Sequence, residues 1–395
     1  MRQRAARGQH LGLIGLISLI SLIGLIGTAQ AQTRPLSDSA YASVITCGPG
    51  NDFYLAFGHS ALRICDPARD IDYAYNYGTF DFGAPHFYWN FARGMMNYCL
   101  SRSHFPNFLA TYDYERRAVW EQRLNLTPQE VNNLYLMLEW NYLPENRYYQ
   151  YDFFRDNCAT RVRDMVENAF GHRTPLYAPC DGKSYRQLVH ESAGPCQQWW
   201  TLGVDLLLGA RTDVSQGVRE AMFHPLRMME TFGQSTAGSA DCRQSMVQPA
   251  KQHLQDHREP LRRSFPPVVV FALLLAVVSL LTAKGWWRPW MDRLLFSIAG
   301  LAGLFLCFMW FGTNHWCTRW NLNILWLSPL LLLIAIRHRK SPAWGLWLQE
   351  GCFAVALVWV VVCGLSAAIL PIIIMLALRV ACLIPRRPQP PRQRH

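Results

Sequence analysis

The chain has 395 residues, of which 51% are hydrophobic and 16% charged, and its net charge is +11. The positive charge lies outside residues 32–265, which hold 23 Lys and Arg against 25 Asp and Glu. A nucleic-acid-binding domain carries a basic excess on its folded surface, so that class is excluded and no nucleic-acid partner is expected. The apolar residues gather in two blocks, 11–27 and most of 266–384, which predicts regions that face different solvents.

Residues 1–31 have the pattern of a signal peptide. Arginines precede an apolar run over residues 11–27, and the small residues Ala29 and Ala31 follow it. We expect cleavage after Ala31, and the alternative is an uncleaved membrane anchor. In both cases residues 32–265 form a domain outside the cytoplasm.

The block 266–384 predicts an all-α transmembrane bundle of about five helices. The expected spans are about 267–283, 294–311, 322–336, 346–362 and 366–383. The last two are separated because their common apolar run exceeds the roughly 20 residues that cross a bilayer. Lys and Arg cluster in the turns after the first and third spans and in the tail 385–395, so five spans bring all three clusters to the cytoplasmic side. We therefore expect a multi-pass protein of the bacterial inner membrane with its larger domain in the periplasm.

Seven cysteines lie between the two apolar blocks: Cys47, Cys65, Cys99, Cys158, Cys180, Cys196 and Cys242. In an oxidising compartment an odd number predicts disulfide pairs and one free thiol. Three disulfides fit this count, with Cys180 and Cys196 as a local pair, and the alternative is that several thiols are buried and reduced.

The sequence around Cys158 predicts a helix N-terminus. Apolar residues recur at helical spacing after Cys158, Gly171 is a natural end, and Asn157 or Asp156 is suited to the N-cap. A thiol in the first turn of a helix has its thiolate stabilised by the helix dipole and free N–H groups, which can also hold an oxyanion. Cys158 is therefore the candidate nucleophile, and a small core residue is the alternative.

A cysteine nucleophile needs a base, and His59 is the candidate. It lies on a predicted strand over 56–64 that pairs, as a hairpin, with a tyrosine-rich strand over 72–78. The imidazole needs a polar partner on its second nitrogen. The hairpin offers three candidates for this partner: Asp66, Asp72 and Asn76. Elsewhere, Thr127 to Glu130 form a capping box that begins a further helix.

Three sequence blocks, 58–63, 75–80 and 156–164, resemble the Lnb N-terminal periplasmic domain family, which is named after a bacterial lipoprotein N-acyltransferase. More distantly, an early-strand histidine followed 99 residues later by a cysteine at a helix start resembles the circularly permuted NlpC/papain-like fold of lecithin:retinol acyltransferase. The resemblance implies an α+β domain in which His59 is the base and Cys158 carries the acyl group. The acyltransferase relatives have a second histidine on the following strand, where this chain has none.

These features predict a membrane-anchored periplasmic thiol acyltransferase or acyl hydrolase that uses an acyl-Cys158 intermediate. The expected partners are the lipid bilayer and a lipoprotein or phospholipid substrate at the outer leaflet of the inner membrane. Further polar side chains expected near the oxyanion or substrate are Asn157, Arg63 and Tyr77. No cofactor or metal is expected, because neither an H-E-x-x-H motif nor paired Cys/His spacing is present. The alternatives are a Cys/His amidase or peptidase of the cell wall and a non-enzymatic, membrane-tethered domain.

Overall fold

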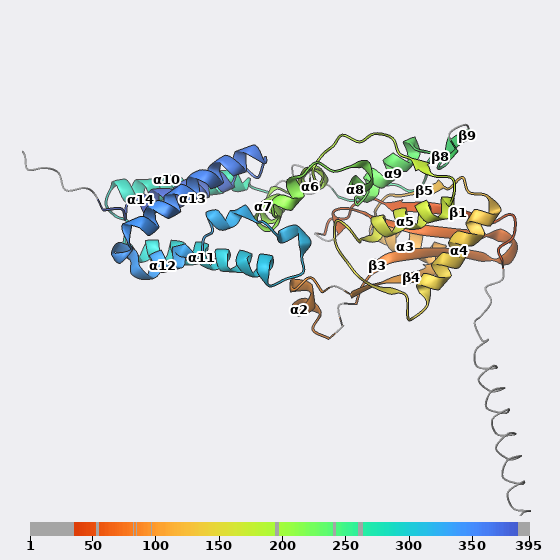
Figure 1. Cartoon of the computed structure of the whole chain (residues 1–395), viewed down its shortest axis with the longest axis horizontal. Coiled ribbons are helices and arrows are strands. Elements are labelled where there is room, and N and C mark those ends of the chain that lie inside the picture. The colour runs from red at the N-terminus through yellow and green to blue at the C-terminus, as the bar shows by residue number, and fades with distance from the viewer. Residues whose placement is uncertain are drawn as a thin grey trace, which may run out of the picture.

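The computed structural model describes residues 35–385 except 53, 54, 82, 84, 96, 194–196, 240, 241 and 260–263. The predicted signal peptide, nearly all of the basic tail and Cys196 therefore lie outside the described residues. Figure 1 shows an α+β domain at one end of the molecule and a bundle of helices extending from it. The predicted fold class, a mixed domain followed by a helical bundle, is confirmed.

A seven-stranded antiparallel sheet is the centre of the domain, with the strand order β10-β5-β1-β2-β3-β4-β6. Its strands are β1 (Tyr41–Cys47), β2 (His59–Asp66), β3 (Ile71–Thr79), β4 (Asn97–His104), β5 (Val119–Arg123), β6 (Tyr148–Gln150) and β10 (Lys251–Leu254). The predicted hairpin is β2 and β3, which are joined by a short 3-10 helix, Pro67–Arg69.

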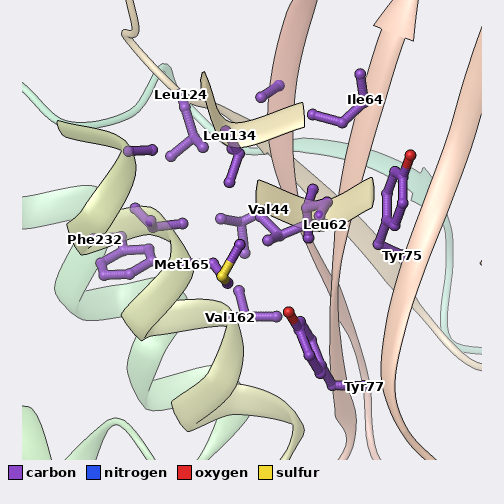
Figure 2. Packing of buried hydrophobic residues seen from close by; sticks show 14 of the residues in the cluster. Val44, Leu62, Ile64, Tyr75, Tyr77, Leu124, Leu134, Val162, Met165 and Phe232 are labelled. Carbon is purple, nitrogen blue, oxygen red and sulfur yellow. The ribbon is translucent and has the colours of Figure 1, made fainter. Parts of the chain in front are cut away.

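Helices cover both faces of this sheet. On one face, α4 (Pro128–Tyr142), α5 (Cys158–Phe170) and α9 (Pro225–Gln234) enclose the main core, where Val162 and Met165 of α5 pack with Val44 and Leu62 of the sheet (Figure 2). On the other face, α3 (Phe105–Tyr114) packs on the alternate residues of the same strands. The core on the α5 side fixes the position of the first turn of that helix.

The helix ends follow the local signals in the sequence. Thr127 and Glu130 form the predicted reciprocal capping box at the start of α4, with Pro128 at its first position. Helix α5 begins at Cys158 and ends before Gly171, which has a positive φ of 54°. Both predictions are confirmed.

The rest of the domain consists of short elements around the sheet. They are α2 (Phe87–Ala92), β7 (Pro175–Leu176), α6 (Tyr185–Ala193), α7 (Gln198–Leu207), a 3-10 helix (Ala210–Asp213), α8 (Val218–Ala221), β8 (Thr236–Ser239) and β9 (Cys242–Ser245). Helices α6 and α7 lie on the side of the domain nearest to the bundle, and α2 projects beside the bundle (Figure 1).

The bundle contains five apolar helices. They are α10 (Pro267–Ala283), α11 (Pro289–Phe311), α12 (Leu330–Arg337), α13 (Ala343–Val362) and α14 (Ile369–Ala381). In the described part of the chain, three segments are long and apolar enough to cross a membrane: Pro289–Phe311, Leu322–Lys340 and Ala343–Val362. Helices α10 and α14 are shorter but equally apolar.

The third expected span, 322–336, is a broken helix. A 3-10 helix over Leu322–Leu325 precedes the break, and α12 begins after Pro329, which has no N–H to continue the ladder. The Gln349 side chain donates a hydrogen bond to the Leu325 carbonyl at 3.0 Å. Irregular backbone inside a membrane domain requires such internal partners, so the break is compatible with a spanning segment.

Helix α7 joins the domain to the bundle. The side chains of Asn321 and Asn323 donate to the carbonyls of Leu206 and Asp205, both at 2.8 Å. The buried Asp205 carboxylate accepts hydrogen bonds from Arg186 at 3.0 Å and from the Ser366 N–H at 2.8 Å. This buried polar network fixes the domain against the end of the bundle.

Six of the seven cysteines outside the bundle are described, and each has a free thiol: Cys47, Cys65, Cys99, Cys158, Cys180 and Cys242. The prediction of three disulfides is therefore wrong for the described residues. The reason is their placement on separate elements; Cys47 and Cys65, for example, lie at opposite ends of the β1–β2 pair. The predicted pair of Cys180 with Cys196 involves a residue outside the described part.

Candidate active site

Cys158 is the first residue of α5, and Asn157 is its N-cap. The Asn157 Oδ1 accepts a hydrogen bond from the Thr160 N–H at 2.9 Å, and the Asn157 N–H donates to the Thr160 hydroxyl at 2.8 Å. The Asn157 Nδ2 donates to the carbonyls of Phe153 and Phe223 at 2.9 and 2.8 Å. Both N–H groups of the Asn157 amide are thus occupied and cannot donate to an oxyanion, so that prediction is wrong. The side chain positions Cys158, and its contact with a substrate stays a prediction.

His59 is the first residue of β2 and lies between Cys158 and Asn76. Its Nε2 forms a hydrogen bond with the Oδ1 of Asn76 on β3, and the ring is hydrogen-bonded to the Cys158 side chain. With an amide oxygen as acceptor, Nε2 carries the proton, which leaves Nδ1 available to the thiol. Of the three candidate partners on the hairpin, the structure places Asn76 at the ring.

The two carboxylates of the hairpin lie elsewhere. Asp66 lies at the opposite end of the eight-residue β2, about 23 Å from His59 at a rise of about 3.3 Å per residue. Its carboxylate is fully buried and accepts hydrogen bonds from the N–H and hydroxyl of Ser37. Asp72 forms an ion pair with Arg63 at 2.7 Å. The prediction of Asp66 as a partner of His59 is therefore wrong: it anchors the beginning of the described chain.

Arg63 does not reach the site either. Its guanidinium binds Glu121 at 3.0 Å in addition to Asp72, and lies 3.8 Å from the centre of the Phe105 ring on the α3 face of the sheet. These partners fix the side chain away from Cys158, so the prediction that Arg63 contacts the oxyanion or substrate is wrong.

Gly78 provides the space in which the reactive groups meet. A Cβ placed there would lie 3.5 Å from the Cys158 Cβ, 3.9 Å from the His59 Cε1 and 4.0 Å from the Tyr149 hydroxyl. Its φ of +90° also favours glycine. This role of Gly78 could not be predicted from the sequence, because it arises only from the packing of α5 against β2 and β3.

Two tyrosine hydroxyls are buried beside this space. Those of Tyr77 and Tyr149 have no hydrogen-bond partner among the described residues, and the two rings pack edge to face with centroids 6.2 Å apart. Burial, together with the charge of the Cys158 thiolate, raises the pKa of Tyr149, so its hydroxyl remains a proton donor. Tyr77 was expected near the oxyanion or substrate. Tyr149 was noted only as one of several tyrosines that either line a cleft or pack in the core, and core packing was favoured.

The two reactive groups shift each other's pKa in opposite directions. Burial raises the pKa of the Cys158 thiol, but the charge and hydrogen bond of His59 and the N–H groups of Ser60 and Ala159 outweigh it, so the net pKa is lowered. Burial lowers the pKa of His59, but the thiolate and Asn76 outweigh it, so the net pKa is raised. Both directions favour a thiolate–imidazolium pair.

Cys47 shows what a thiol without such partners does in the same domain. It pairs with His59 in the β1–β2 ladder and is fully buried, and burial raises its pKa to about 12. Cys158 keeps 8% of its surface exposed and its pKa moves the other way. A small core residue would behave as Cys47 does, so this contrast argues against that alternative.

Two family models match the chain: the Lnb N-terminal periplasmic domain over residues 28–190 and the Lnb transmembrane domain over residues 259–386. The chain belongs to the Lnb family. No curated protein and no solved structure matches it. Cys158, His59 and Asn76 lie within the match to the periplasmic domain, and helices α10 to α14 lie within the match to the transmembrane domain. The chain is thus a membrane protein with a periplasmic domain.

Proposed function

We propose that this Lnb protein is a thiol acyltransferase or acyl hydrolase that forms an acyl-thioester on Cys158. The observation that carries the proposal is the linear arrangement of Cys158, His59 and Asn76 at the N-terminus of α5, with pKa shifts that favour the ion pair. A nucleophile, a base and an orienting group in hydrogen-bond contact are the minimum set for covalent acyl transfer.

In the first half of the reaction, the Cys158 thiolate attacks the carbonyl of an ester or amide. The Thr160 N–H is already bonded to Asn157, so the oxyanion that forms accepts hydrogen bonds from the N–H groups of Cys158 and Ala159 at the start of α5. It also accepts one from the Tyr149 hydroxyl, which has no other partner in the described chain. The imidazolium of His59 gives its proton to the departing alkoxide or amine. The bond to the leaving group breaks and an acyl-thioester remains.

In the second half, an amine, a hydroxyl or water attacks the thioester. The neutral His59 takes the proton of the attacking group, the C–S bond breaks, and the thiolate–imidazolium pair is restored. The acceptor decides between transfer and hydrolysis. In both cases the donor loses one acyl chain and becomes a lyso product.

The attachment of the domain to the bundle supports a membrane substrate. The Asp205 network holds the domain at one end of the helices, so the domain that carries Cys158 remains next to the membrane. We infer that the acyl donor is a lipoprotein or phospholipid in the outer leaflet of a bacterial inner membrane. The signal-peptide pattern and the basic turns of the bundle support this orientation.

Mass spectrometry of lipoproteins from cells that express wild type, Cys158→Ala, His59→Ala or Cys47→Ala at equal membrane levels tests the proposal. We expect an altered acylation state with wild type and with the Cys47 control, and none with the other two variants. An unchanged lipoprotein profile together with unchanged phospholipids in all four strains would contradict the proposed substrate class.

A further inference from the structure

Helix α2 exposes aromatic side chains beside the bundle. It is six residues long, lies between β3 and β4, and leaves 77% of Tyr88, 57% of Trp89 and 47% of Phe91 exposed. In Figure 1 it projects from the sheet next to the end of α11 that faces the domain. So much exposed aromatic surface on one short segment indicates a binding surface.

Contacts with the bundle fix the level of α2. The Trp89 ring stacks on Phe308 of α11 with centroids 6.5 Å apart. The Asn314 N–H donates to the Arg93 carbonyl at 2.8 Å, and the His315 Nε2 lies 3.0 Å from the Phe91 carbonyl. The segment is therefore attached to the last turn of α11 and the residues that follow it.

That level is the edge of the membrane. Helix α11 is long enough to span a bilayer, and its exposed face is apolar up to its last residue. The exposed apolar residues on the half of α11 nearest to the domain are Leu301, Leu304, Phe305, Phe308 and Phe311. Trp310 in the last turn of α11 and Trp320 beyond that helix have ring centroids 5.3 Å apart, as expected of an aromatic belt at the interface. The exposed face of α2 thus continues the lipid-facing surface of α11.

A row of contacting aromatic rings connects α2 to the candidate active site. Phe87 of α2 stacks on Phe80 at 5.9 Å, Phe80 contacts Tyr98 at 4.9 Å, and Tyr98 stacks on Tyr151 at 4.4 Å between centroids. Tyr151 is close enough to Cys158 for the thiolate to raise the pKa of its hydroxyl, after the larger effect of burial. The four rings therefore lead from the membrane edge to the nucleophile.

We propose that α2 inserts its aromatic face into the outer leaflet of the membrane and that this row of aromatic rings guides the acyl chain of a membrane lipid toward Cys158. The insertion stands on the geometry alone, and the guidance rests on the proposed function. The occupant is lipid because the surface is continuous with a lipid-facing helix. Arg93, whose guanidinium lies 5.9 Å from the Trp89 ring centre, suits a headgroup phosphate at the same level.

Photo-crosslinking tests the insertion. A benzoylphenylalanine at position 88 of the full chain, in vesicles of phosphatidylethanolamine and phosphatidylglycerol, should form a lipid adduct that mass spectrometry detects. The matched control is position 114 on α3, where the native tyrosine is 90% exposed but belongs to the far face of the sheet. Three results would overturn the insertion: no lipid adduct at position 88, an adduct with protein in place of lipid, or equal lipid adducts at both positions.

A second comparison tests the guidance. Tyr88→Asp should lower acyl release from phosphatidylethanolamine and a diacylglyceryl lipopeptide in vesicles by roughly tenfold, since a charge is disfavoured at the membrane interface. Release from the soluble p-nitrophenyl butyrate should stay near wild type, and Tyr114→Asp should affect neither. Equal losses on both kinds of substrate would overturn the guidance. If wild type acts on neither, the proposed function fails while the crosslink still decides the insertion.

Discussion

Replacing Asn76 by alanine removes the acceptor that holds the His59 ring, and the reactivity of Cys158 should report the loss. The hydrogen bond from Nε2 to Asn76 is one of the causes that raise the pKa of His59. Without it the pKa of His59 falls, the imidazolium is less populated, and its charge lowers the pKa of Cys158 less. The thiol of the variant should therefore ionise at higher pH than that of wild type.

The size of this effect follows from the charge on the ring. A hydrogen bond to a charged group contributes about 1.5–3 kcal/mol net. One pKa unit corresponds to about 1.4 kcal/mol, so the pKa of His59 should fall by about 1–2 units. The midpoint of Cys158 ionisation should rise by up to the same amount through the coupling of the two groups, and the rate of alkylation below both midpoints should fall by up to about 10- to 100-fold.

The assay is the rate at which iodoacetamide alkylates Cys158 in the full chain, followed on the peptide by mass spectrometry as a function of pH. Asn133→Ala is the matched control, because Asn133 lies exposed on α4 and bonds only to Gln129 among the described side chains. Asn76→Asp keeps an acceptor oxygen at the ring and should retain the low midpoint. A midpoint in Asn76→Ala equal to that of Asn133→Ala would show that Asn76 does not influence the ionisation of Cys158.

Three further predictions follow from the same geometry. Activity on an acyl donor should rise with pH as Cys158 ionises, at a pKa below the ordinary 9.0, and fall again as His59 loses its proton, at a pKa above the ordinary 6.5. An activity that keeps rising through both values would contradict the ion pair. Gly78→Ala should cost about 1–3 kcal/mol of backbone strain and add a methyl group in contact with Cys158 and His59, so turnover should drop while circular dichroism stays native. Full turnover would show that the site does not need glycine there. Asp66→Asn should lower the free energy of unfolding by about 1–3 kcal/mol in denaturant titrations, because Ser37 loses a charged acceptor, and should leave the rate of Cys158 alkylation unchanged. Slower alkylation would show that Asp66 does influence the active site.

The sequence contained the local part of this site. The helix start at Cys158, its N-cap and its end at Gly171 all depend on neighbours within one or two turns, so pattern alone could locate them. The hairpin register could also have identified the partner of His59 from the sequence. With the turn at 67–70, the register pairs Leu62 with Tyr75, which brings Asn76 toward the His59 end and leaves Asp66 at the turn.

Long-range partners could not be read from the sequence. Arg63 was expected near the substrate, but Glu121, 58 residues later, holds it on the opposite face of the sheet. Tyr149 reaches Cys158 from a three-residue edge strand whose pairing with β4 has no strong local signal. The attachment of α2 to α11 joins segments more than 200 residues apart. Each of these contacts depends on how separate elements pack against one another, which no local sequence pattern indicates.

The most direct test of the central claim is to trap the acyl group on Cys158. The purified full chain is incubated with vesicles that contain phosphatidylethanolamine and a diacylglyceryl lipopeptide, quenched in acid, and analysed by mass spectrometry of the Cys158 peptide. We expect the mass of one fatty acyl group on that peptide, its removal by neutral hydroxylamine, and its absence in His59→Ala. A lyso product formed at an undiminished rate by Cys158→Ala would show that Cys158 is not the nucleophile.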